Sequence, residues 1–169
     1  MSNADLLQVA LKQIEFARGY TLTLLDDIDE ADWFTMPSGC VTHIAWQVGH
    51  LAMAQYGLAL FRQRGRQPAD TELMSSKFRK QFSRGATPDP NSGNNATPAE
   101  IRDVFDQVHQ QVLTEVPGFS TDELDTLIPE PYAVFDTKLG ALFFCANHEM
   151  LHAGQIGLIR RMLGKAAIR

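Results

Sequence analysis

The sequence has little of what marks secreted, membrane-bound or nucleic-acid-binding proteins. No stretch approaches the ~20 uninterrupted apolar residues that a helix needs to cross a bilayer. The first residues, MSNADLLQ, lack the basic-then-apolar pattern of a secretory signal. Only two of the 169 residues are cysteine, which excludes a disulfide framework. We therefore expect a cytoplasmic protein with no membrane partner.

Positive charge is also scarce. The chain has 15 Lys and Arg against 20 Asp and Glu, so its net charge is −5. Proteins that bind nucleic acids need a basic face for the phosphates, and we therefore expect no nucleic-acid partner. The nearest approach to a basic cluster is RQRGR at Arg62–Arg66, which we interpret as a solvated turn at the end of a helix.

What the sequence does contain is apolar residues at a spacing of three or four, the pattern of amphipathic helices. Four segments are predicted to be long helices: residues 5–27, 40–62, 97–116 and 137–164. The third begins with a capping box, in which Thr97 is the cap, Pro98 follows, and Glu100 closes the box. With 44% apolar and 21% charged residues, residues 1–169 suit a single globular domain.

One connection between these helices is long. Residues 65–95 are polar and rich in Gly and Pro, with a short helix expected at 71–82 and a loop at GATPDPNSGNN. A second short helix is expected at 120–127, before an irregular stretch at 129–136. No alternating strand pattern is visible. We therefore predict an all-α fold, a four-helix bundle with a long connection between helices two and three and one or two short extra helices.

The fourth predicted helix carries two histidines, His148 and His152, about one turn apart on the same face. This is the spacing at which one helix offers two imidazoles to one metal ion. At about 100° per residue, the same face carries Ala141, Phe144, Cys145, Leu151, Gln155, Ile156 and Ile159. The pair is therefore expected to point inward, where unpaired imidazoles are costly. We interpret both as metal ligands.

A stable site needs at least one more protein ligand. His50, in the middle of the apolar stretch at 40–62, is our candidate, although a lone histidine on such a face is often an ordinary core residue. His43 lies two turns away, about 10 Å along a helix, so one ion cannot readily take both. We assign His43 to the core or the end of the bundle, and His109 to the solvent.

The sequence HEMLH also fits the HExxH pattern of zinc peptidases, in which the glutamate is a general base. The extended pattern fails, because Gln155 and Leu158 stand where glycine and histidine are required. No acidic residue follows Glu149, so the alternative glutamate ligand is missing too. Glu149 itself is open to two interpretations, a base near the metal site or a partner in a surface or inter-helix hydrogen bond.

Two further residues of this helix have open roles. Cys145 is a ligand, a reactive thiol or a small buried filler, the last being the commonest case. Gln155 is placed to bond within the site or to orient a histidine. The opposite face of the helix is small and apolar, and consists of Leu139, Phe143, Ala146, Met150, Ala153, Gly154 and Gly157. It suits packing against the first helix or a second copy in a homodimer.

The segments WQVGHLAMAQ and NHEMLHAGQIGLIRRMLG together resemble the DinB/YfiT-like superfamily. Residues 18–37 also resemble the first helix of that family and the turn after it, so the resemblance covers essentially the whole chain. It implies a four-helix bundle with a metal held by three histidines. By position, His50 matches the first ligand, while His148 and His152 match the pair. The connection at 65–95 is where such proteins vary.

The resemblance implies less about activity. Characterised relatives are similar in fold to thiol-dependent transferases and isomerases that use bacillithiol or mycothiol, and to the metal-binding domain of ergothioneine-forming sulfoxide synthases. Many others have no known reaction, and fold does not fix function. Three neutral imidazoles without a carboxylate would leave the charge of a divalent ion uncompensated, which favours an anion such as hydroxide or a thiolate.

We therefore expect a metal-dependent enzyme that acts on a small molecule. Zinc and nickel are the first choices of ion, since imidazole suits both. The favoured chemistry transfers a low-molecular-weight thiol to a small electrophile. The alternatives are hydrolysis of a small substrate and a metal-binding or stress-response protein without turnover.

Overall fold

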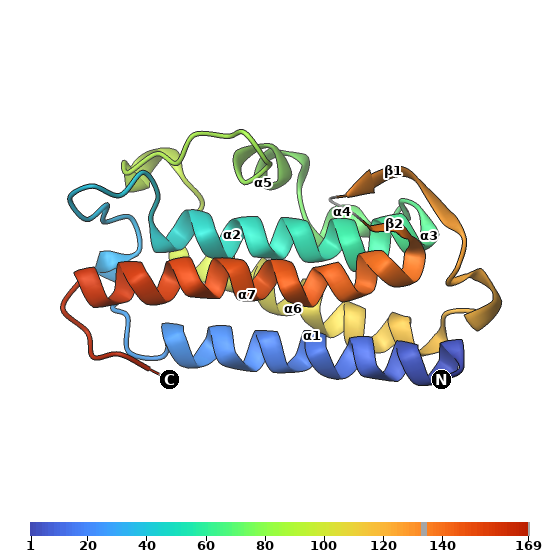
Figure 1. Cartoon of the computed structure of the whole chain (residues 1–169). Coiled ribbons are helices and arrows are strands. Elements are labelled where there is room, and N and C mark those ends of the chain that lie inside the picture. The colour runs from blue at the N-terminus through green and yellow to red at the C-terminus, as the bar shows by residue number, and fades with distance from the viewer. Residues whose placement is uncertain (133–134, 169) are drawn as a thin grey trace.

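Four long helices run alongside one another in the computed structural model, which describes residues 1–132 and 135–168 (Figure 1). They are α1 (Asn3–Leu25), α2 (Ile44–Gln55), α6 (Pro98–Glu115) and α7 (Lys138–Met162). Helix α1 packs mainly against α7, while α2 packs against both α6 and α7. None of the described helices is long and apolar enough to cross a membrane. The predicted all-α four-helix bundle is confirmed.

Side-chain caps set the start of three of these helices. Ser2 and Asp5 form a capping box at α1, and Thr97 and Glu100 form the predicted one at α6. Thr137 accepts a hydrogen bond from a backbone N–H in the first turn of α7. Each cap satisfies a donor that has no partner inside its helix, so these starts are determined locally.

The second helix departs from the continuous helix predicted for residues 40–62. Helix α2 begins only after His43, whose Nδ1 accepts the backbone N–H of Trp46 and so caps the helix. Its far end widens into a π-helical turn at Tyr56–Phe61 and continues as α3 (Arg62–Arg64). A π turn leaves an all-apolar pattern unbroken, so periodicity could not reveal it.

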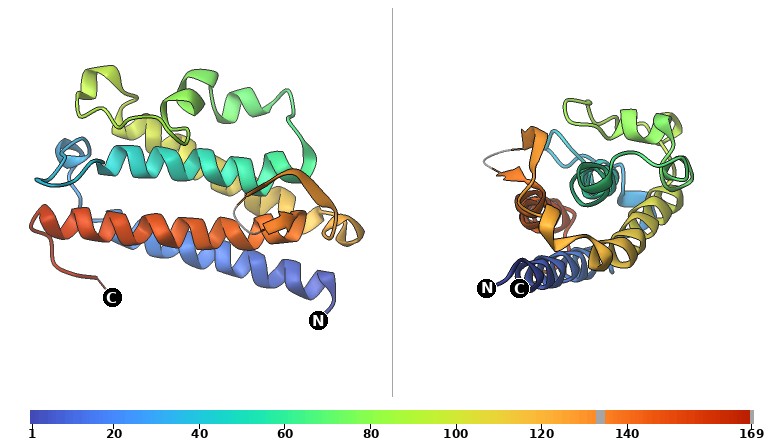
Figure 2. Two further views of the ribbon diagram at one scale, coloured as in Figure 1. Left: turned by 45° about the horizontal axis from the view of Figure 1, so that its top comes forward. Right: turned by 90° about the vertical axis from the view of Figure 1, so that its right-hand side faces the viewer.

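The long connection between α2 and α6 lies over α2 (Figures 1 and 2). The single helix predicted at 71–82 is divided into α4 (Asp70–Leu73) and α5 (Ser76–Gln81), because Met74 adopts an extended conformation. Buried side chains on this segment, including Met74 and Phe82, join the core of the bundle. The connection is therefore packed onto the bundle over part of its length.

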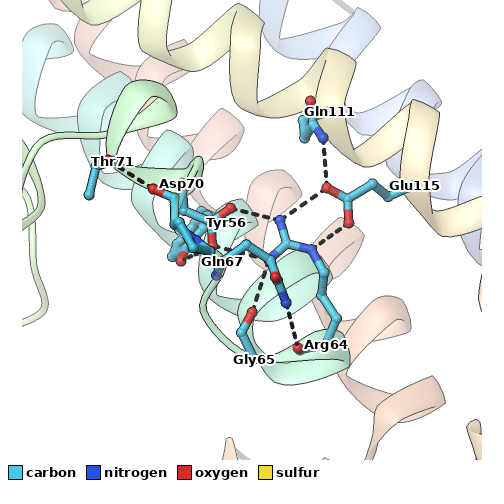
Figure 3. Close-up of polar contacts among 9 residues, drawn as sticks. Tyr56, Arg64, Gly65, Gln67, Asp70, Thr71, Gln111 and Glu115 are labelled. Carbon is cyan, nitrogen blue, oxygen red and sulfur yellow. Dashed lines mark hydrogen bonds and ion pairs between the residues drawn. The ribbon is translucent and has the colours of Figure 1, made fainter.

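An ion-pair cluster anchors the start of this connection (Figure 3). Arg64 donates to Asp70 at 2.8 Å and to Glu115 at 3.0 Å. Asp70 also accepts a hydrogen bond from the Tyr56 hydroxyl at 2.8 Å, and burial together with this carboxylate raises the pKa of Tyr56 to about 12. The prediction of a solvated turn at 62–66 is therefore wrong for Arg64, which joins the connection to α6.

A small antiparallel hairpin precedes α7, formed by β1 (Leu127–Tyr132) and β2 (Phe135–Thr137). The helix predicted at 120–127 is reduced to a 3-10 turn at Thr121–Glu123, and most of the stretch predicted to be irregular, 129–136, is extended. The two residues between the strands lie outside the described part of the chain. Two prolines within β1 hid the strand from the sequence, because proline lacks the N–H that a strand ladder uses.

Candidate metal centre

The structure brings His50 of α2 together with His148 and His152 of α7. One ring nitrogen from each lies within 4.8 Å of the other two. The ring centroids are 4.8 Å apart for His50 and His152, 5.3 Å for His50 and His148, and 4.5 Å for the α7 pair. Three imidazole nitrogens this close together form a donor set of the kind that binds zinc.

Hydrogen bonds fix the orientation of the His50 and His152 rings. The Nδ1–H of His50 donates to the backbone carbonyl of Phe82 at 2.8 Å. The Nδ1–H of His152 donates to the side-chain oxygen of Gln47, whose amide nitrogen in turn donates to Gln155 at 2.9 Å. Because Nδ1 carries the proton in both rings, each presents the lone pair of Nε2, as second-shell partners arrange for metal-binding histidines. These residues fit a metal ion.

Burial keeps the three imidazoles neutral. Burial, together with the neighbouring histidine rings, lowers the pKa of His148 to about 4 and that of His152 to about 3. Burial likewise lowers the pKa of His50. Only a neutral imidazole can donate a lone pair, so all three are in the ligating form at pH 7.

Packing around His50 explains the sequence WQVGH. The indole of Trp46 stacks on the imidazole of His50, with ring centroids 4.8 Å apart and an angle of 7°. A Cβ at Gly49 would lie 2.6 Å from the ring of Phe82, so glycine lets this ring lie directly on α2. That contact brings the Phe82 carbonyl to the imidazole of His50. Phe82 and Gln47 are the residues of the site that sequence reasoning missed.

The histidine cluster lies nearer the surface than the sequence suggested. Leu151, predicted on the inward face of α7, is 62% exposed, and Gln155 on the same face is also exposed. His148 is buried and His152 is half-buried. The cluster therefore lies at the edge of the seam between α2 and α7.

A second polar cluster lies deeper, on a neighbouring face of α7. Arg18 of α1 donates to Glu149 at 2.8 Å, to the side chain of Gln55 at 2.8 Å and to the carbonyl of Phe105 at 2.7 Å. Gln55 also bonds His109 at 3.1 Å. We call Arg18, Glu149, Gln55 and His109 the arginine network; with the Phe105 carbonyl it joins all four long helices. Of the two interpretations of Glu149, the structure shows the inter-helix partner.

The arginine network shows that the predicted exposure of His109 is wrong, and it decides the role of Cys145. His109, expected to face solvent, is buried, and burial together with the charge of Arg18 lowers its pKa to about 4. Cys145 is buried beside Gln55, and burial raises the pKa of its thiol. It therefore packs as a small core residue and takes no part in the histidine cluster. His43 is also apart from the cluster, since its two nitrogens bond Trp46 and the carbonyl of Asp89.

The small-residue face of α7 packs against α1, one of the two partners that the sequence left open. Ala146 and Ala153 are buried there, and a Cβ at Gly157 would make ordinary contact with Leu24 at 3.7 Å. Met150 and Gly154, from the same predicted face, are exposed. The homodimer stays a prediction.

Known proteins share this fold. The chain is similar to a conserved protein of a locus from Enterococcus faecalis, with a TM-score of 0.72 over 94% of this chain and 97% of that one. At 16% identity, this similarity shows the fold alone. No curated protein matches the sequence. The DinB superfamily matches residues 13–156, a span that includes all three clustered histidines, and the chain therefore belongs to the DinB superfamily.

Proposed function

We propose that His50, His148 and His152 bind one divalent metal ion, zinc or nickel, and that the protein is an enzyme that transfers a low-molecular-weight thiol to a small electrophile. The observation that carries this proposal is the chemistry of the donor set. Three neutral imidazoles converge, and two of them present Nε2 because a carbonyl or an amide oxygen holds Nδ1. This donor set suits a borderline-soft divalent ion.

The surroundings of the cluster favour a thiol over water as the nucleophile. A bound divalent ion would supply positive charge that lowers the pKa of an incoming thiol. Water, with a far higher pKa, benefits more from a general base. The acidic residue nearest in sequence, Glu149, is held by Arg18 on a neighbouring face of α7 and cannot serve as that base.

The chain does not supply the thiol itself. Cys145 is buried in the arginine network, and the sulfur of Cys40 lies 3.5 Å from the sulfur of Met162 near the end of α7. Neither belongs to the histidine cluster. The proposed thiol is therefore a second small substrate.

The test is product formation by the zinc-loaded and nickel-loaded protein on a panel of small electrophiles, with and without thiols, analysed by mass spectrometry. Thiol conjugates that require both metal and thiol would support the proposal. Hydrolysis products formed without thiol would replace it with metal-dependent hydrolysis. Tight metal binding without any turnover would leave a metal-binding protein. The variant His109→Gln is the matched control for His50→Gln, because both replace a buried histidine by glutamine and only His50 belongs to the cluster.

A further inference from the structure

A cavity of about 370 Å³ lies beside the histidine cluster, between α2, α5 and the loop that follows α5. Its lining includes Trp46, whose indole stacks on His50 and lies 6.5 Å from His152 between ring centroids. Lys77 and Lys80 of α5 line it as well, together with polar loop residues. One side chain, Trp46, therefore contacts both the cavity and the cluster.

The loop wall of this cavity is held in place by side chains. The carbonyl of Asp89 accepts hydrogen bonds from His43 at 3.0 Å and from Asn95 at 2.9 Å. The Nδ1 of His43 accepts the Trp46 N–H, so this ring is a neutral tautomer with its proton on Nε2. His43 thus ties the loop to the start of α2 and fixes two walls of the cavity relative to each other.

The charge of the cavity is unusual for this acidic chain. Lys77 and Lys80 are three residues apart and lie on the same side of α5. Neither forms an ion pair within the described residues. The carboxylate of Asp89 is occupied by the backbone N–H of Asn91 and the side chain of Asn94. Asp89 also lines the cavity, and these hydrogen bonds lower its pKa and keep it ionised, so two ammonium groups and one carboxylate give the lining a net charge of +1.

We propose that this cavity binds a carboxylate group of the thiol substrate, while the thiol extends past Trp46 to the histidine cluster. The inference rests on the proposed function and gives its substrate a chemical class, thiols that carry a carboxylate. Lys77 and Lys80 attract the anion, and amide and hydroxyl groups of the loop supply hydrogen-bond donors. Both lysines are exposed, so the selectivity expected from them is moderate and depends on salt.

The experiment compares two thiols that differ in charge, mercaptohexanoate and mercaptohexanol, by NMR titration of the zinc-loaded protein. Mercaptohexanoate should bind about fivefold more tightly at low salt. The variant K77Q/K80Q should lose this preference. The variant K12Q/K165Q, which removes the same charge from other surfaces, should keep it. Equal binding of the two thiols to the wild type, or a preference retained in K77Q/K80Q, would overturn the proposal.

A second arm separates this proposal from the proposed function. The metal-free protein is titrated with hexanoate and hexanol, which contain no thiol. A carboxylate preference that disappears in K77Q/K80Q supports the cavity assignment whether or not thiol transfer occurs, and equal binding overturns it. The proposed function fails separately, if zinc does not tighten the binding of either thiol.

Discussion

Two polar clusters lie on different faces of α7, and they differ in how their charged or polar groups are satisfied. In the arginine network, every guanidinium nitrogen of Arg18 donates a hydrogen bond, and both carboxylate oxygens of Glu149 accept one. In the histidine cluster, His50 and His152 each use one ring nitrogen and direct the other toward the neighbouring histidines. The saturated ion pair of Arg18 and Glu149 needs no ligand, whereas ring nitrogens that converge from three histidines indicate one.

The sequence separates these roles by a single position, since His148 and Glu149 are neighbours. Consecutive residues of a helix point about 100° apart, so one reaches the seam with α2 and the other reaches α1. The residues of the HExxH pattern therefore have two different roles in this protein. Its histidines form the candidate metal centre, and its glutamate holds the bundle together.

The largest expected effect comes from breaking the buried ion pair. Glu149→Leu leaves the charge of Arg18 without its partner in the core, and we expect a loss of about 3–5 kcal/mol in the free energy of unfolding. The double variant R18M/E149L removes both charges and should recover much of that loss. Urea denaturation of the metal-free protein measures both. A loss below about 1 kcal/mol in the single variant would show that the network does not stabilise the bundle.

Removing a metal-binding histidine should weaken zinc binding strongly and change the stability of the metal-free protein little. We expect His148→Ala to weaken zinc binding more than about 100-fold, because two imidazoles no longer complete the site. The stability of the metal-free protein should change little, since the substitution also relieves the crowding of three imidazoles. Competition with a chelator measures the affinity, and urea denaturation measures the stability. Unchanged zinc affinity would remove His148 from the proposed site.

Acid should destabilise the metal-free protein through the arginine network as well as the cluster. The pKa of His109 is lowered from 6.5 to about 4, so the unfolded chain binds a proton between these values that the folded chain does not. Stability is therefore complete above pH 6.5 and falls as the pH decreases toward 4. We expect His109→Gln to remove about 3 kcal/mol of this dependence, measured by denaturation at several pH values. An unchanged pH dependence would contradict burial of a neutral His109.

The smallest effect concerns the orientation of one ring. Gln47→Leu removes the acceptor for His152 Nδ1 and keeps all three ligands, so we expect zinc affinity to fall about tenfold. Gln63→Leu is a matched control on the next part of the same helical segment, since Gln63 bonds only backbone carbonyls away from the cluster. Chelator competition measures both variants. Equal losses of zinc affinity in the two would assign Gln47 a structural role alone.

Much of the fold followed from periodicity and caps, because these are local signals. The Thr97 box and the 3–4 spacing gave α6 correctly, and the spacing of His148 and His152 placed two rings on one face. The sequence pattern did not reveal the hairpin, because β1 contains two prolines, which are uncommon in strands. The roles of Arg64 and His109 could not be predicted because each depends on partners from other helices. The local sequence pattern of one segment does not identify such partners.

The sequence predicted the three histidines of the candidate site, but not the groups that hydrogen-bond to them. Gln47 lies one turn from His50 on α2, a spacing that could have suggested it. The Phe82 carbonyl had no signal, because a backbone acceptor carries no residue type and its approach depends on the crossing of the long connection over Gly49.

The central claim is that three imidazoles from α2 and α7 surround one ion. X-ray absorption spectroscopy of the zinc-loaded protein, with the metal content measured on the same sample, tests it most directly. We expect one zinc per chain, with three imidazole nitrogens at about 2.0–2.1 Å and no sulfur from the protein. A cysteine sulfur among the ligands, or fewer than three imidazoles, would contradict it.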